Sequence, residues 1–121
     1  MNTYTIYAEL KEGINGHDFV KAMSEYLDSL PKCVSYRIQR MKLGFRSQNL
    51  GEWRIDMDFK TMQDLDDSMD MVLYNKDTIH KHIAFAKMVD QESLDHFLYP
   101  VSYTHLRAHE TREDGGFPRR E

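Results

Sequence analysis

Three segments of the chain alternate between apolar and polar residues, which is the pattern of a β-strand with one buried face. They are residues 3–10, 34–43 and 52–60. The apolar positions of the first and third segments are Tyr4, Ile6, Ala8 and Leu10, and Trp53, Ile55, Met57 and Phe59. A short loop joins the second and third segments, so we expect these two strands to form a hairpin.

Two other parts of the chain carry apolar residues at helical spacing. The first helix is predicted to begin after Asn15, a typical N-cap residue, and to end before Pro31. Thr61 is the expected N-cap of a second helix, whose apolar residues are Leu65, Met69, Val72 and Leu73. Residues 75–77 interrupt that helix. A further helical segment is then expected to about residue 84, with Ile79, Ile83 and Ala86 facing inward.

The end of this region is less clearly patterned. Residues 87–91 are compatible with a short fourth strand, and residues 93–99 fit either a strand or a short helix. The resulting order, βαββαβ, is that of the ferredoxin-like α+β fold. In this fold a four-stranded antiparallel sheet has its first and third strands at the centre and its helices on one face. The other face, called the open face below, is either exposed to solvent or covered by a partner.

The open face is predicted to be polar. Its side chains come from three strands and are Thr5, Tyr7 and Glu9, then Ser35, Arg37, Gln39 and Met41, then Arg54, Asp56 and Asp58. Cross-strand pairing could bring Arg54 close to Glu9 or Tyr7. Two interpretations follow: an exposed face of a monomer, or a face buried against a second copy that closes a barrel with a polar interior.

Two motifs support the second interpretation. Arg37-x-x-Arg40-x-Lys42-Leu43-Gly44-Phe45, followed by Leu50-Gly51-Glu52-Trp53, is similar to a small bacterial family of unknown function. Residues 82–90 and Tyr99-Pro100 also fit that family. As a whole, residues 1–100 resemble the dimeric α/β-barrel superfamily, which includes antibiotic-biosynthesis monooxygenases and stress-responsive barrel proteins. The resemblance implies a homodimer whose two sheets enclose a small cavity, and it carries over no catalytic residue.

Composition narrows the class of protein. The 121 residues include 16 Lys+Arg, 20 Asp+Glu and one cysteine, which gives a net charge of −4. This charge argues against nucleic acid or an anionic membrane as a general partner. A single cysteine suits a reducing compartment, and neither a transmembrane segment nor a secretory signal is visible. We therefore expect a cytoplasmic protein.

Arg37 and Arg54 are the strongest candidates for binding a ligand inside the barrel. Guanidinium groups bind carboxylate, phosphate or enolate oxygens through paired hydrogen bonds. Tyr7 and Gln39 share the same face and complete the candidate ligand-binding set. In the alternative interpretation the two arginines neutralise Glu9, Asp56 and Asp58 within a dimer interface.

The candidate catalytic residues are His82 and Tyr7. His82 could act as a general base, because imidazole titrates near neutral pH, while Tyr7 and Arg54 could stabilise an oxyanion. A lone histidine is otherwise a packing or surface residue. We expect no cofactor. We also expect no metal, since His80 and His82 point about 200° apart on a helix and cannot bind one ion together. The acidic residues at the start of the second helix also lack the spacing of a calcium loop.

Three functions remain open. The first is a homodimer that binds a small anionic or carbonyl-bearing molecule in the barrel interior. The second is a cofactor-independent monooxygenase or isomerase of the antibiotic-biosynthesis-monooxygenase type, acting on an enolisable substrate. The third is a structural or regulatory dimer without a ligand. Fold analogy alone does not separate them.

The last 21 residues differ from the rest. Residues 101–111 match, residue for residue, one translated reading frame of a transposase sequencing adapter. From residue 102 onward there is neither a helical nor a strand pattern, and Gly115, Gly116 and Pro118 break any structure. We therefore expect one domain at residues 1–100, followed by a non-native, disordered tail at 101–121.

Overall fold

The sheet confirms the fold expected from the strand patterns. A computed structural model describes residues 1–44 and 50–100, so the predicted tail lies outside the described residues. The strands are β1 (Asn2–Ala8), β2 (Ser35–Arg40), β3 (Trp53–Phe59) and β4 (Asp95–Tyr99). They form one antiparallel sheet in the order β2-β3-β1-β4, with the first and third strands at the centre. This is the ferredoxin-like arrangement.

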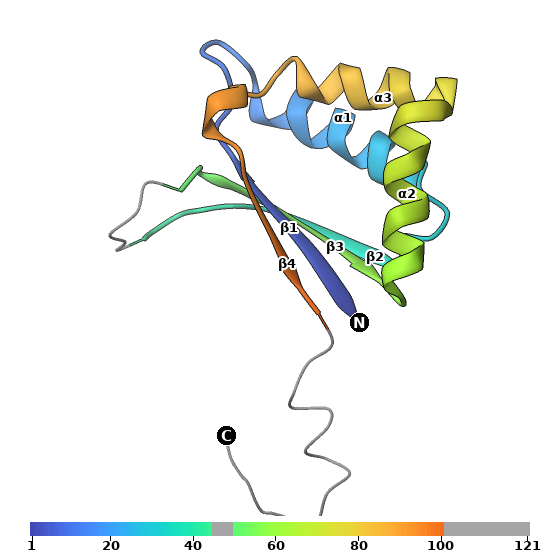
Figure 1. Cartoon of the computed structure of the whole chain (residues 1–121). Helices are drawn as coiled ribbons and strands as arrows, with labels where there is room; N and C mark the ends of the chain where they lie inside the picture. Colours follow the sequence, from blue (N-terminus) through green and yellow to red (C-terminus); the bar gives the residue numbers. More distant parts are fainter. Residues whose placement is uncertain (45–49, 101–121) are drawn as a thin grey trace, which may run out of the picture.

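The helices lie on one side of this sheet (Figure 1). They are α1 (Gly16–Asp28), α2 (Met62–Tyr74) and α3 (Lys76–Ala86), and a short 3-10 turn, η1 (Gln91–Ser93), precedes β4. The expected N-caps are present: the Asn15 side chain accepts from the His17 N–H, and Thr61 Oγ1 accepts from the Asp64 N–H. Asn75 ends α2 and caps α3, which confirms the predicted interruption. No helix within residues 1–44 and 50–100 is long and apolar enough to cross a membrane.

The core lies between the helices and the sheet. The apolar positions predicted for β3 are all buried, and Phe19 of α1 packs edge-on against Trp53 with ring centroids 5.3 Å apart. Other buried core residues come from β1, α1, α2 and the end of α3: Ala8, Met23, Tyr26, Leu27, Leu65 and Phe85. The core holds the sheet and helices as one unit, so groups on either side of the sheet have fixed positions.

Gly51 shows why the loop motif before β3 needs a residue without a side chain. A Cβ atom at this position would lie 2.4 Å from the backbone carbon of Ala8. The Glu9 carboxylate also accepts a hydrogen bond from the Glu52 N–H at 2.7 Å. The backbone just before β3 therefore packs against and hydrogen-bonds to the end of β1.

Two details of the expected pattern are wrong. The fourth strand is Asp95–Tyr99, not residues 87–91; only Val89 of the earlier segment forms a bridge, to Leu10, and its side chain packs into the core. In α3 the buried residues are Thr78 and Phe85, whereas Ile83 is 56% exposed. The inward face of α3 is thus rotated from the one that its isoleucines indicate.

Candidate functional site

The open face presents three rows of side chains, one from each strand in register. Facing residues in the register share a side of the sheet. The rows, ordered from β4 to β2, are Tyr99–Thr3–Asp58–Ser35, Phe97–Thr5–Asp56–Arg37 and Asp95–Tyr7–Arg54–Gln39. The four predicted ligand-binding residues, Tyr7, Arg37, Gln39 and Arg54, therefore do lie together on this face.

The two carboxylates at the centre of this face are buried. Asp58 accepts from Thr3 Oγ1 at 2.7 Å, from Ser35 Oγ at 2.6 Å and from Arg37 Nη1 at 2.8 Å. Burial by itself would raise the pKa of Asp58, but these three donors outweigh it and lower that pKa to about 2. The hydrogen bond to Asp58 correspondingly raises the pKa of Arg37.

Asp56 forms the second ion-pair centre. It is 2% exposed, accepts from Thr5 Oγ1 at 2.5 Å, and lies 3.1 Å from Arg54 Nε. Arg37 Nε approaches it at 3.6 Å. Both arginine side chains remain about half exposed, so each guanidinium group covers a buried carboxylate while facing outward.

Tyr7 and Gln39 lie at one end of the same face. The guanidinium carbon of Arg54 is 5.9 Å from the Tyr7 ring, and Phe97 meets that ring edge-on at 6.0 Å. Gln39 is the register partner of Arg54 on β2. Of the three acidic residues considered as partners of the arginines, Asp56 pairs with Arg54 and Asp58 with Arg37, while Glu9 accepts from the backbone N–H of Glu52.

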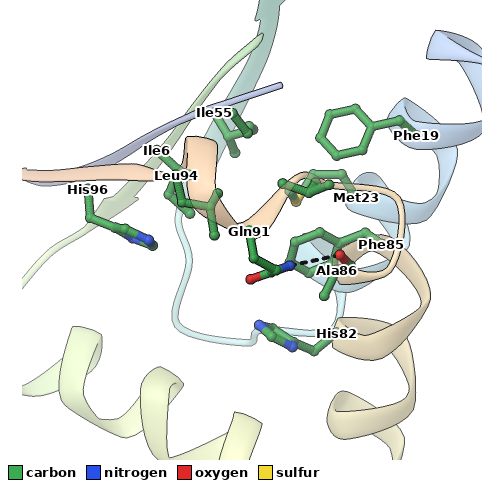
Figure 2. A pocket seen from close by; sticks show the side chains of 12 residues that line it. Ile6, Phe19, Met23, Ile55, His82, Phe85, Ala86, Gln91, Leu94 and His96 are labelled. Atoms are coloured by element: carbon green, nitrogen blue, oxygen red, sulfur yellow. Dashed lines mark hydrogen bonds between the residues drawn. The ribbon is translucent and has the colours of Figure 1, made fainter. Parts of the chain in front are cut away.

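His82, the other catalytic candidate, lies on the opposite side of the sheet. It lines a pocket of about 70 Å³ between the sheet and the helices (Figure 2). The pocket walls are mostly apolar and come from β1, α1, β3, α3 and the segment before β4, including Ile6, Phe19, Met23, Ile55, Phe85 and Leu94. Three polar residues, His82, Gln91 and His96, complete the lining, and we call them the mouth residues.

His82 is held by aromatic contacts. Its ring lies 5.3 Å from that of Tyr26 and 4.9 Å from that of Phe85, both near perpendicular. Burial lowers the pKa of His82, so the ring is neutral at neutral pH and has one acceptor nitrogen. No hydrogen bond ties this ring to another described residue, which leaves both nitrogens available to a bound molecule.

The other two mouth residues are each fixed by one hydrogen bond. Tyr4 Oη lies 2.5 Å from His96 Nδ1, and the Gln91 amide nitrogen donates to the backbone oxygen of Ala86 at 2.9 Å. Figure 2 shows His82 and His96 on either side of Gln91, with the apolar side chains of Ile55, Phe19 and Met23 above them in the view. The pocket thus combines an apolar interior with polar groups at one side.

Sequence reasoning found His82 but not its neighbours. His96 and Gln91 fall in the two segments whose secondary structure the pattern left unclear, and Tyr4 has the signal of an ordinary strand residue. The sequence signal that could have found them is the pairing of two residue types: His96 in a strand-like segment and Tyr4 on the helix-facing side of the first strand. Within the described part of the chain, no group of three or more His, Cys, Asp or Glu side chains could hold a metal ion.

The sheet order and the one-sided helices define a ferredoxin-like α+β protein. More particularly, the chain belongs to a family of unknown function, DUF6614, whose model matches residues 1–101. No protein of curated function is significantly similar in sequence.

Solved structures resemble the chain in fold alone. At3g17210 from Arabidopsis thaliana is 9% identical with a TM-score of 0.67, covering 84% of this chain and 96% of that one. A dimeric ferredoxin-like protein of unknown function from Jannaschia sp. CCS1 is 8% identical with a TM-score of 0.62, covering 83% and 98%. A variant of SnoaB, a cofactor-independent oxygenase from Streptomyces nogalater, is 9% identical with a TM-score of 0.57, covering 83% and 91%.

Proposed function

We propose that the protein is a homodimer joined through the open face, and that each protomer binds a small, mostly apolar molecule with a carbonyl group in the pocket between sheet and helices. The observation that carries the ligand proposal is the pocket itself, with apolar walls and three polar mouth residues. Pockets with this combination are the usual sites of small-molecule binding.

The homodimer is supported by the composition of the open face. Phe97 and Tyr99 expose 39% and 52% of their surface there, beside the ion-paired centre. Asp56 and Asp58 cancel the charges of Arg37 and Arg54, which reduces the cost of removing this face from water. Several proteins with this fold are described as dimeric.

The size of the pocket limits the ligand. A cavity of about 150 Å³ admits benzene, so a space of about 70 Å³ takes roughly three carbon atoms. A short alkyl chain would fill the interior, and its carbonyl group would lie at the mouth. A carbonyl compound suits this site better than an anion, because no lysine or arginine is among the described residues that line the pocket.

In this proposal the open-face arginines, Arg37 and Arg54, are less suited to binding the ligand than the pocket is. Each guanidinium already pairs with a buried carboxylate at 2.8–3.6 Å, so an anionic ligand would have to compete with Asp56 and Asp58. A ligand site inside the barrel, formed by Tyr7, Arg37, Gln39 and Arg54, would need two copies of the face. It is the alternative location that the experiment below must separate from the pocket.

Catalysis is the second candidate function, and the state of His82 favours it. A neutral imidazole that makes no hydrogen bond to a described residue could remove a proton from the carbon next to a bound carbonyl and return it at another position, as an isomerase does. A neighbouring donor would stabilise the enolate oxygen. SnoaB, which has this fold, is described as a cofactor-independent oxygenase.

Thermal unfolding with pentan-2-one tests the binding site, because a ligand that binds only the folded state stabilises it by RT ln(1 + [L]/Kd) and so raises Tm. For the wild type we expect an increase in Tm that grows with the logarithm of the ketone concentration above Kd. Ala86→Leu, which fills the pocket, should abolish it, whereas Ala84→Leu on the same helix but outside the pocket lining should not.

Arg54→Gln separates the two locations. It should preserve the increase if the ligand binds in the pocket and lose it if the ligand binds inside the barrel. An unchanged response of Ala86→Leu, or no response of the wild type, would overturn the pocket as the binding site.

A further inference from the structure

The hydrogen bonds of two mouth residues, Gln91 and His96, specify the chemistry of the ligand more closely than the size of the pocket does. Gln91 donates through its amide nitrogen to the Ala86 carbonyl oxygen at 2.9 Å. This contact fixes which end of the amide is nitrogen and occupies one of its two N–H donors, so Oε1 is the acceptor that Gln91 offers to a ligand. We assign Gln91 this acceptor role at the mouth.

His96 has the opposite role, and Tyr4 determines it. Tyr4 Oη and His96 Nδ1 are 2.5 Å apart. A phenol is a much stronger acid than a neutral imidazole N–H, and imidazole nitrogen is the stronger base, so the pairing favours the tautomer in which the tyrosine hydroxyl donates to an unprotonated Nδ1. Burial raises the pKa of Tyr4, which keeps this hydroxyl protonated. With Nδ1 accepting from Tyr4, the ring carries a proton on Nε2, where it is a donor.

The donor and the acceptor belong to the same pocket lining. His96 reaches the pocket from β4, and Gln91 reaches it from the 3-10 turn just before that strand. Figure 2 shows both side chains at the polar side of the pocket. A ligand that satisfies both needs one oxygen that accepts and one hydroxyl that donates, on a short apolar chain.

We propose that the pocket recognises a short-chain hydroxyketone, with His96 donating to the carbonyl oxygen, Gln91 accepting from the hydroxyl group, and Tyr4 acting as the positioning residue for His96. The inference rests on the proposed function, because it names the ligand class of the same pocket. It assigns roles to three residues, Tyr4, Gln91 and His96, that the sequence pattern does not single out.

The test compares two probes, pentan-2-one and 1-hydroxypentan-2-one, by NMR titration of the full-length protein. The wild type should bind the hydroxyketone about fivefold more tightly, the typical effect of one neutral hydrogen bond. Gln91→Met should remove this preference while still binding both probes. Equal affinities of the wild type for the two probes would overturn the role of Gln91.

Tyr4→Phe tests the positioning role. Tyr36→Phe is its matched control, since it also removes a hydrogen-bonded tyrosine hydroxyl from a strand of the sheet, but one that pairs with Asp28 outside the pocket lining. Tyr4→Phe should weaken both probes about fivefold, and Tyr36→Phe should weaken neither. If the two variants bind alike, Tyr4 has no positioning role, although the pocket remains a binding site. If neither probe binds the wild type, the proposed function fails as well.

The nitrogen resonances of His96 give a readout that a purely structural role of Tyr4 would not change. At a pH where the ring is neutral, Nδ1 should be the unprotonated nitrogen in the wild type, and Nδ1–H should increase in Tyr4→Phe. A wild-type ring that carries its proton on Nδ1 would overturn the inference, because His96 would then be an acceptor at the mouth.

Discussion

Replacing Asp58 with asparagine removes the charge from the most strongly hydrogen-bonded carboxylate of the open face while keeping its shape. Asp58 accepts from Thr3, Ser35 and Arg37, and its pKa is lowered from 3.8 to about 2. At about 1.36 kcal/mol per pKa unit, this shift corresponds to roughly 2.4 kcal/mol of folding free energy. Because the Arg37 side chain is 48% exposed, solvent screening reduces the expected loss to about 1–2 kcal/mol.

The loss should depend on pH in one direction. The pKa of Asp58 is lower in the folded than in the unfolded chain, so its contribution is complete above about pH 4 and disappears as the pH falls toward 2. Asp58→Asn should therefore be less stable than the wild type at pH 7, and the difference should shrink through that window.

Urea unfolding followed by circular dichroism measures this difference. All variants need one protein concentration, since the unfolding of a dimer depends on concentration. Asp70→Asn, at an exposed position of α2, is the control and should change stability by less than about 0.5 kcal/mol at every pH. A loss for Asp58→Asn no larger than that of the control, or one that is independent of pH, would refute the assigned role of the carboxylate.

Three further predictions concern other parts of the molecule. Gly51→Ala should lower the free energy of unfolding in urea by more than about 3 kcal/mol, because its Cβ would lie 2.4 Å from the backbone of Ala8. Gly13→Ala, which has open space around it, should lower this free energy by only about 1–2 kcal/mol because of its positive φ. Equal losses for the two variants would contradict the close approach at Gly51. If the open face forms the proposed dimer interface, Phe97→Asp should give a monomer in light scattering, whereas Leu73→Asp, on an exposed helix position off the sheet, should leave a dimer. A dimer in both variants would exclude the open face as the interface. The lowered pKa of His82 means that protonation favours the unfolded chain. The stability of the wild type should therefore fall as the pH drops below about 6.5, and the stability of His82→Gln should fall less. Parallel curves of stability against pH for the two proteins would be inconsistent with a buried neutral ring.

The central elements of the fold were predictable because burial imposes a regular pattern on them. β1 and β3 are the central strands, with one face packed on helices, so their apolar residues alternate. The N-caps Asn15, Thr61 and Asn75 mark the helix starts for the same local reason, since their side chains accept from free backbone N–H groups.

The errors occur where burial is incomplete. β4 is an edge strand whose side chains are largely exposed, so Asp95–Tyr99 has little alternation. In α3, Thr78 is buried and His82 lines the pocket, while Ile83 is exposed, so hydrophobicity indicates the wrong face.

The pocket could not be predicted from spacing at all. Its lining comes from segments up to 90 positions apart, from Ile6 to His96, and only the packed fold brings them together. The open-face residues are different, because Tyr7, Arg37, Gln39 and Arg54 follow from strand alternation once the sheet order is known. Their position was predictable, and pairing with Asp56 and Asp58 was one of the two interpretations of the arginines. Only the structure shows that Glu9 is not among the partners and which carboxylate each arginine contacts.

The central claim is that the ligand site is the pocket between sheet and helices, and an NMR titration with pentan-2-one tests it most directly. The account predicts saturable shifts of the backbone amides of Phe85, Ala86, Leu94 and His96, with little change at Arg37 and Arg54. Saturable shifts confined to Arg37, Arg54 and their open-face neighbours would contradict it and place the ligand between two sheets. The absence of any saturable shift would contradict carbonyl binding altogether.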